Sequence, residues 1–167
     1  MPSLCYIKII LQEGGKKMPY LIGEETFALL PNSKGTKIIE EYKSFIVNEA
    51  TPSIVDRNCY MNGSSFLGRQ KGSAYLIGTS YKPPILINGY KNIILIPTHS
   101  IRNKKCAWLN FHTIVTYYEN NQKKTIVELK NSKKVVLEIS YNIFDKQIAR
   151  ATRLEYALKG YNKQKHL

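Results

Sequence analysis

Residues 62–87 read NGSSFLGRQKGSAYLIGTSYKPPILI, and the expected organisation of the chain is built outward from them. Three glycines predict backbone turns around Arg69 and Lys71. Lys82 precedes two prolines, which fix an extended path without an N–H donor. Cations on so constrained a backbone lose little conformational entropy on binding, so this stretch indicates an anion-binding surface. The alternative is a surface loop with ordinary solvating charges.

The positive charge is unevenly distributed along the 167 residues. The whole chain carries +13 at pH 7, with a pI of about 9.6. Residues 1–50 hold six Lys and Arg against six Asp and Glu, whereas residues 51–167 hold nineteen against six. Such an imbalance is typical of a domain that meets a polyanion, most often nucleic acid. Neither end carries a basic amphipathic helix or a lipidation motif, so we expect a cytoplasmic, nucleoid-associated protein with no membrane partner.

The motifs of common enzymes are absent from the sequence. Gly63 and Gly68 have P-loop spacing, but Arg-Gln follows where Lys and Ser or Thr are required. The acidic residues are scattered rather than paired for acid–base catalysis. The three cysteines include no C-x-x-C pair, so they predict neither a disulfide framework nor a zinc ribbon, and Cys59, His99 and Cys106 are too scattered to indicate a metal site. We expect no enzyme activity, no catalytic residue, no metal site and no cofactor.

The hydrophobic pattern predicts a β-rich fold. Expected strands cover residues 26–30, 36–40, 43–48, 73–80, 84–87, 93–96, 107–119, 124–130 and 133–140. A short helix is expected over 53–61, because Thr51 and Pro52 suit a helix start. An amphipathic helix is expected over 142–161, where apolar side chains share one face. The predicted class is α+β, with antiparallel strands and hairpins and the C-terminal helix packed on the sheet.

The chain length fits one domain, expected over residues 18–161, with a basic frayed tail over 162–167. Residues 13–15 (Glu-Gly-Gly) can be encoded by a purine-rich ribosome-binding sequence, and Met18 follows at a suitable distance. Residues 1–17 are therefore expected to be a mis-called upstream extension or a disordered leader. The intact mass of the natively expressed protein tests this expectation. A product that includes residues 1–17 contradicts a start at Met18.

Four groups of cations are candidates for phosphate contact, since few acidic residues interrupt them. They are Arg69, Lys71 and Lys82; Arg102, Lys104 and Lys105; Lys123, Lys124, Lys133 and Lys134 on a hairpin; and Lys146, Arg150 and Arg153 on the last helix. The selected DNA-binding candidates are Arg69, Lys71, Lys82, Arg102, Lys104, Lys105, Lys133, Lys134, Arg150 and Arg153. Twelve tyrosines offer stacking surfaces, so a single-strand or RNA-binding module is an alternative.

Six segments resemble, in the same order, those of the competence transcription factor family, the ComK-type activators of Gram-positive bacteria. They are IVDRNC at 54–59, NGSS with Gly68-Arg69 at 62–69, Ser80 with KPPI at 82–85, IPT at 96–98, Cys106 with WL at 108–109, and ISYN at 139–142 with Gln147 and Arg150. The resemblance extends over roughly residues 25–160.

This resemblance implies a transcription factor that binds AT-rich promoter DNA at runs of A and T, largely through the minor groove, and activates DNA-uptake genes. It also implies self-association as a dimer or higher oligomer, and an adaptor that delivers the protein to a Clp protease. Stiff A-tracts have a narrow, electronegative minor groove that attracts Arg and Lys. Arg69 and Arg102 are therefore the expected candidates for insertion into that groove.

The sequence departs from longer family members at its C-terminus. It ends at Leu167 and contains no segment like Phe-Met-Leu-Tyr-Pro-Lys, which in longer members binds the adaptor. The resemblance therefore supports DNA binding better than it supports adaptor binding or full activation. The alternative function is that of a truncated, non-activating relative that acts through hetero-oligomers.

Overall fold

A computed structural model of the protein describes residues 18–164, and a six-stranded antiparallel sheet lies at its centre. Its strands are β1 (Thr26–Asn32), β2 (Gly35–Glu40), β3 (Ser44–Val47), β4 (Ile85–Asn88), β5 (Ile93–Pro97) and β6 (Trp108–Asn110). The spatial order is β3-β2-β1-β6-β5-β4. Two three-stranded units thus meet at the β1–β6 pair, where Ala28 faces Leu109 and Leu29 faces Trp108.

A second sheet and three α-helices complete the described part of the chain. The sheet contains β7 (Ile114–Glu119), β8 (Thr125–Leu129) and β9 (Lys134–Leu137) in that order, and a 3-10 turn, η2 (Phe111–Thr113), precedes it. The helices are α1 (Thr51–Met61), α2 (Phe66–Ile77) and α3 (Tyr141–Gln164). The predicted α+β class, with antiparallel sheets and a C-terminal helix packed on strands, is confirmed.

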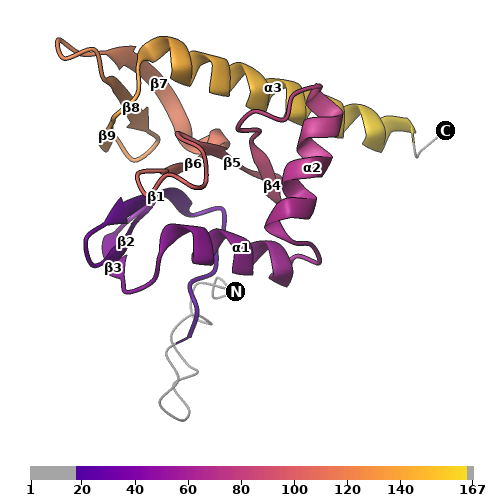
Figure 1. The fold of residues 1–167 in the computed structure, drawn as a ribbon, viewed down its shortest axis with the longest axis horizontal. Coiled ribbons are helices and arrows are strands. Elements are labelled where there is room, and N and C mark those ends of the chain that lie inside the picture. Colours follow the sequence, from indigo (N-terminus) through magenta and orange to yellow (C-terminus); the bar gives the residue numbers. More distant parts are fainter. Residues whose placement is uncertain (1–17, 165–167) are drawn as a thin grey trace, which may run out of the picture.

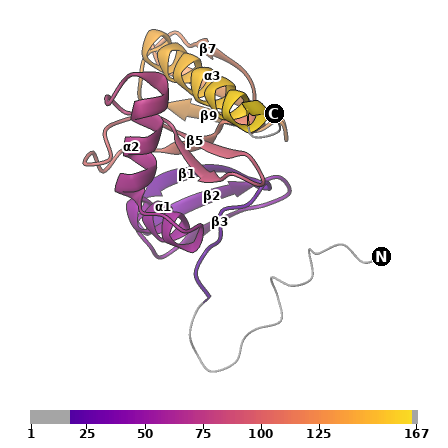
Figure 2. The same cartoon turned by 90° about the vertical axis from the view of Figure 1, so that its right-hand side faces the viewer.

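The six-stranded sheet is buried on both faces, which gives the molecule its layers. Strand β5 shows this best, because all five of its residues are buried. Ile93 and Leu95 face a core shared with α1, whereas Ile94 and Ile96 face a core shared with α3 and the small sheet. Figures 1 and 2 show α1 and α3 on opposite sides of this sheet, with α2 running between them.

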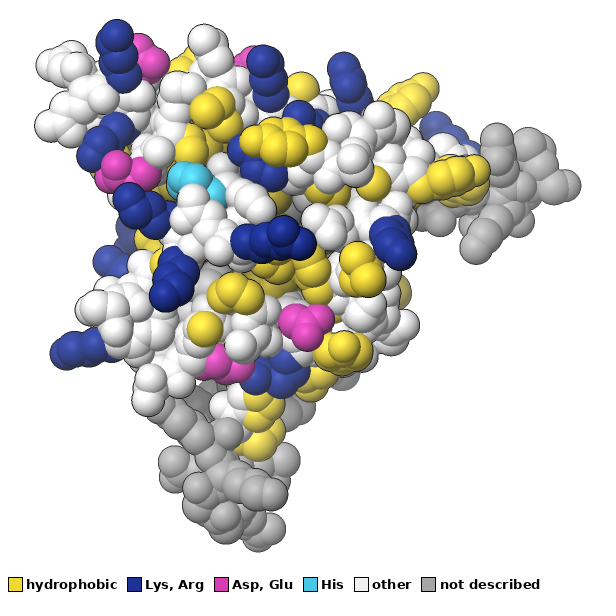
Figure 3. Space-filling model, in the orientation of Figure 1, with side chains coloured by type: hydrophobic (Ala, Val, Ile, Leu, Met, Phe, Trp, Pro, Cys, Tyr) yellow, Lys and Arg dark blue, Asp and Glu magenta, His cyan; other side chains and the backbone are white. Residues whose placement is uncertain are grey.

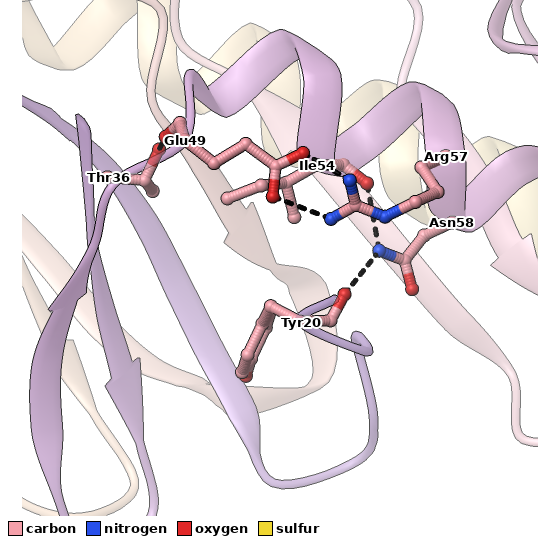
Figure 4. Close-up of polar contacts among 6 residues, drawn as sticks. All are labelled: Tyr20, Thr36, Glu49, Ile54, Arg57 and Asn58. Carbon is pink, nitrogen blue, oxygen red and sulfur yellow. Dashed lines mark hydrogen bonds and ion pairs between the residues drawn. The ribbon is translucent and has the colours of Figure 1, made fainter. Parts of the chain in front are cut away.

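Helix α1 is fixed to the first described residues by a polar network (Figure 4). The Arg57 guanidinium binds both carboxylate oxygens of Glu49. The Asn58 amide nitrogen donates to the main-chain oxygens of Tyr20 (3.0 Å) and Ile54 (2.8 Å), and its oxygen accepts from Ile22 N at 2.9 Å. The charged and polar residues of the 54–59 segment therefore have a structural use in the fold.

Residues 66–77 form helix α2, so the strand expected over 73–80 and the glycine loop before it are corrected. The Ser65 hydroxyl caps the helix start by accepting from Gly68 N at 3.0 Å. Gly78, with a φ of 71°, ends the helix in the left-handed region. Gly68 and Gly72 consequently lie within a helix, and the turn-forming glycines of this region are Gly63 and Gly78.

Residues 107–119 do not form one long strand, because the chain leaves one sheet and enters the other. Strand β6 ends at Asn110, whose side-chain oxygen accepts from His112 N at 3.3 Å and whose amide donates to Thr26 O at 3.0 Å. The Thr113 hydroxyl donates to Asn110 O at 2.8 Å. These bonds stabilise η2 as a corner, after which β7 pairs with β8.

The other expected elements are present with shifted ends. The predicted helices over 53–61 and 142–161 correspond to α1 and α3, and the hairpins over 84–96 and 124–140 correspond to β4–β5 and β8–β9. The first three predicted strands correspond to β1, β2 and β3. The expectations for residues 1–17 and 165–167 lie outside the described residues.

Gly35 is the glycine whose replacement is expected to damage the fold most. It has a φ of 125°, and a Cβ built there would lie 2.1 Å from Val47 O. We expect Gly35→Ala to lower the free energy of unfolding by about 2–4 kcal/mol, since both the backbone and the β2–β3 contact must change.

Gly72→Ala is the matched control, because a Cβ there meets nothing within 4 Å and the position is helical. It is expected to raise the free energy of unfolding by about 0.5–1 kcal/mol. Urea unfolding followed by circular dichroism measures both values. Equal stabilities for the two variants contradict this account.

Candidate nucleic-acid interface

Cations from three distant segments lie near one end of the six-stranded sheet; they are Lys82, Lys105 and Arg150. Lys82 lies before β4, and the loop over 98–105 follows β5. Because β4 and β5 are antiparallel, with Ile85 opposite Leu95, the start of one strand lies beside the end of the other. Helix α3 brings Arg150 to the same place.

Tyr81 is the centre of this arrangement. The residue is 64% exposed, and the Lys82 Nζ lies 4.9 Å from the centroid of its ring. The Arg150 guanidinium carbon lies 5.5 Å from the same centroid. Both distances are within the range of a cation–π interaction. We refer to Tyr81, Lys82, His99, Lys105 and Arg150 as the Tyr81 cluster.

His99 adds a neutral imidazole to the cluster. Partial burial, and then the positive charges of Lys82 and Lys105, lower its pKa below the ordinary value of 6.5. Its Nδ1 lies 2.9 Å from the Thr98 hydroxyl. The net positive charge of the Tyr81 cluster at neutral pH therefore comes from its lysines and arginine. The nearby acid is Glu138, which pairs with Lys124 at 2.9 Å.

The buried side chain of Gln147 connects the segments that carry these cations. Its amide nitrogen donates to Pro97 O at 2.6 Å and to Lys82 O at 3.1 Å. Its oxygen accepts a hydrogen bond from Arg150 Nη1. Helix α3 is thereby joined to the end of β5 and to the segment before β4. These buried hydrogen bonds fix the segments that carry the Tyr81 cluster relative to one another.

A cavity of about 150 Å³ lies beside the Tyr81 cluster. Phe66 of α2 and Trp108 of β6 line it, together with Lys82 and His99. The two aromatic rings meet edge to face, with centroids 5.9 Å apart. The exposed Arg102 and Lys104 line a separate, wider hollow near the start of α1. The 98–105 loop therefore presents cations toward two neighbouring depressions.

The remaining predicted cations lie elsewhere or are already engaged. Arg69 Nη2 donates to Asn62 O at 2.8 Å, at the C-terminal end of α1. Lys133 Nζ donates to the Ser44 hydroxyl at 2.7 Å, and Lys134 lies 3.9 Å from a Glu128 oxygen. These two lysines are at the opposite end of the β8–β9 hairpin from Glu138. In the part of the chain that the structure describes, Lys71 and Arg153 are exposed and have no ion-pair partner.

The surface has the charge that the composition predicts. Figure 3 shows Lys and Arg side chains spread over the face on which α1 and α2 lie, with few Asp and Glu among them. Within residues 18–164, no group of three or more His, Cys, Asp or Glu side chains is arranged to hold a metal ion. None of the helices in that range is both long enough and apolar enough to cross a membrane.

Similarity to known proteins identifies the family of the chain. The family model described as ComK protein matches residues 17–163. The competence transcription factor of Bacillus subtilis (strain 168) is 34% identical over 139 residues, which is 81% of this chain and 72% of that protein. The chain belongs to the ComK family. This is a family of transcription factors, not of enzymes, and no solved structure matches the chain.

Sequence reasoning selected Lys82, Lys105 and Arg150 but did not assign a role to Tyr81 or to the Gln147 amide. Tyr81 directly precedes Lys82 in the Ser80-Tyr81-Lys82-Pro83 segment, and this proximity to a candidate cation could have indicated a role for the tyrosine. Gln147 is fully buried on α3 among apolar side chains, and a polar residue on the apolar face of a helix indicates a buried hydrogen-bonded group. The convergence of these residues depends on strand order, which local patterns do not give.

Arg69 is expected to contribute to stability through its bond to the end of α1. We expect Arg69→Ala to lower the free energy of unfolding by about 1–2 kcal/mol, because the Asn62 main-chain oxygen then loses its charged hydrogen-bond donor. Lys71→Ala removes an exposed cation two residues away and is expected to change stability by less than about 0.5 kcal/mol. Chemical denaturation of both variants makes the comparison, and an Arg69→Ala protein as stable as the Lys71→Ala protein opposes a structural role.

Proposed function

We propose that this chain is a transcription factor that binds A/T-run promoter duplexes, largely through the minor groove, and activates DNA-uptake genes. The observation that carries the proposal is the Tyr81 cluster, in which Lys82 and Arg150 lie beside one exposed aromatic ring and Lys105 is close enough to act on the neighbouring His99. Membership of the ComK family and the charge of +13 support it. The domain proposed for this role covers residues 18–161.

The physical basis is the match between fixed cations and a narrow anionic groove. Duplex DNA carries closely spaced phosphates, and each cation that neutralises one releases a counterion. The narrow minor groove of an A-tract concentrates negative potential and attracts arginine and lysine. Arg150 and Lys82 are held beside Tyr81 before DNA arrives, whereas Arg102 is exposed on the neighbouring loop and is free to reach into a groove.

Self-association and nucleoid localisation belong to the same proposal. Repeated A/T runs along one face of a duplex suit a protein that binds as a dimer or higher oligomer. Adaptor-mediated delivery to a Clp protease is an expectation that comes from the family resemblance. A hetero-oligomeric, non-activating role predicts that this chain alters transcription only when a longer relative is present, which a reporter assay in both backgrounds resolves.

The second candidate is binding of single-stranded nucleic acid. Strongly exposed tyrosines favour it, because bases stack on accessible aromatic rings. Tyr81 is one of these, and Tyr75 on α2 and Tyr156 on α3 are others. Competition between duplex and single-stranded probes of the same sequence distinguishes the two candidates.

The main prediction is steeply salt-dependent binding with a preference for A/T-run duplexes. Affinity of the wild-type protein is expected to fall by roughly a hundredfold or more between 50 and 200 mM salt. Lys82→Ala and Arg150→Ala are each expected to weaken binding and to reduce the slope of log K against log salt by about 1. Fluorescence anisotropy with labelled duplexes measures these quantities, and chemical probes specific for each groove report the binding mode.

Lys91→Ala is the matched control for these variants. Lys91 is exposed at the turn between β4 and β5, at the other end of the hairpin from Lys82. Its removal also lowers the net charge by one but is expected to leave the salt slope unchanged. Equal losses for Lys91→Ala and Lys82→Ala, or equal affinity for A/T-run and mixed duplexes, would speak against the proposed interface.

A further inference from the structure

The Gln147 amide makes hydrogen bonds to two other segments of the chain and to Arg150 of its own helix. The side chain is fully buried. Both amide hydrogens are used, one for Pro97 O at 2.6 Å and one for Lys82 O at 3.1 Å. The oxygen accepts from the Arg150 guanidinium. A buried amide in this arrangement leaves its partners unsatisfied if it is removed, which is costly in a site away from water.

Each partner of Gln147 is directly connected to the cations of the Tyr81 cluster. Arg150 is itself one of them. Lys82 has a φ of 45°, which is unfavourable for a residue other than glycine and persists only where the surroundings hold it. Pro97 is the last residue of β5, so its carbonyl fixes the start of the 98–105 loop.

We propose that Gln147 is a positioning residue for DNA binding, which sets the relative places of Lys82, Arg150 and the 98–105 loop before DNA arrives. Cations that are already ordered lose less conformational entropy on binding. Gln147 itself contacts no DNA in this account. The inference rests on the proposed function, and specifically on DNA binding by the Tyr81 cluster.

Gln147→Met tests the inference, since methionine has a similar length and supplies no hydrogen bond. We expect this variant to bind an A/T-run duplex about tenfold more weakly than the wild type, because the cations lose their fixed arrangement. In a background that already lacks both side chains (Lys82→Ala with Arg150→Ala), the same substitution is expected to change affinity by about twofold or less. A merely structural role does not produce this dependence on the background.

Thr125→Val is the control for loss of a buried polar group elsewhere. The Thr125 hydroxyl is buried in β8 and donates to Ile139 O at 2.8 Å. We expect its removal to lower the melting temperature while leaving DNA affinity unchanged. If Gln147→Met does not fold, Gln147→Glu replaces it, because glutamate keeps an acceptor for Arg150 but supplies neither amide donor. Its DNA affinity is compared in the same two backgrounds, and a loss is again expected in the wild-type background.

The outcomes separate this inference from the proposed function. Wild-type protein that shows no salt-dependent binding to A/T-run duplexes overturns both. Wild-type binding together with a folded Gln147→Met of unchanged affinity overturns the positioning role alone. An equal loss of affinity from Gln147→Met in the wild-type and in the doubly substituted background also overturns it, since the residue then does not act through Lys82 and Arg150.

Discussion

The pairing of β1 with β6 is the contact on which the whole arrangement depends. It joins the two three-stranded halves of the central sheet through a short register, with Ala28 opposite Leu109 and Leu29 opposite Trp108. The Asn110 amide adds a side-chain hydrogen bond between β6 and β1 by donating to Thr26 O at 3.0 Å. The β1–β3 unit comes from residues 1–50, whose charge is balanced, and it is thereby joined to the β4–β6 unit, which carries Lys82 and the 98–105 loop. Both faces of that sheet are covered, so the basic segments rest on a rigid layer.

The sequence predicted those elements in which a local pattern and the tertiary packing agree. The β8–β9 hairpin has strict alternation, and α3 has a clear apolar face. Helix α2 was missed because its glycines are turn formers by propensity, whereas the cap at Ser65, the left-handed Gly78 and the packing of Leu76 and Ile77 decide in favour of a helix. The corner at Asn110 was missed because residues 107–119 are rich in aromatic and β-branched residues typical of a strand, and this composition does not reveal where a side chain bends the backbone.

The sequence predicted which cations are candidates for binding but not which of them lie together on one surface. Net charge and its distribution are properties of the sequence, so the expectation of an anionic partner needed no coordinates. Which cations share one surface depends on contacts between residues far apart in the chain, such as the 50 positions between Gln147 and Pro97. The structure brings Lys82, Lys105 and Arg150 together, and it ties Arg69 and Lys133 to other parts of the fold.

Gln147 holds two loops, the segment before β4 and the start of the 98–105 loop, through the main-chain oxygens of Lys82 and Pro97. A carbonyl oxygen is present whichever side chain the residue carries, so the anchor does not recognise the sequence of the loops it holds. Substitutions in these loops can alter the chemical groups that are presented while leaving their places unchanged. The surface can therefore acquire a different preference for its target without a new scaffold, provided that residue 147 keeps a carboxamide.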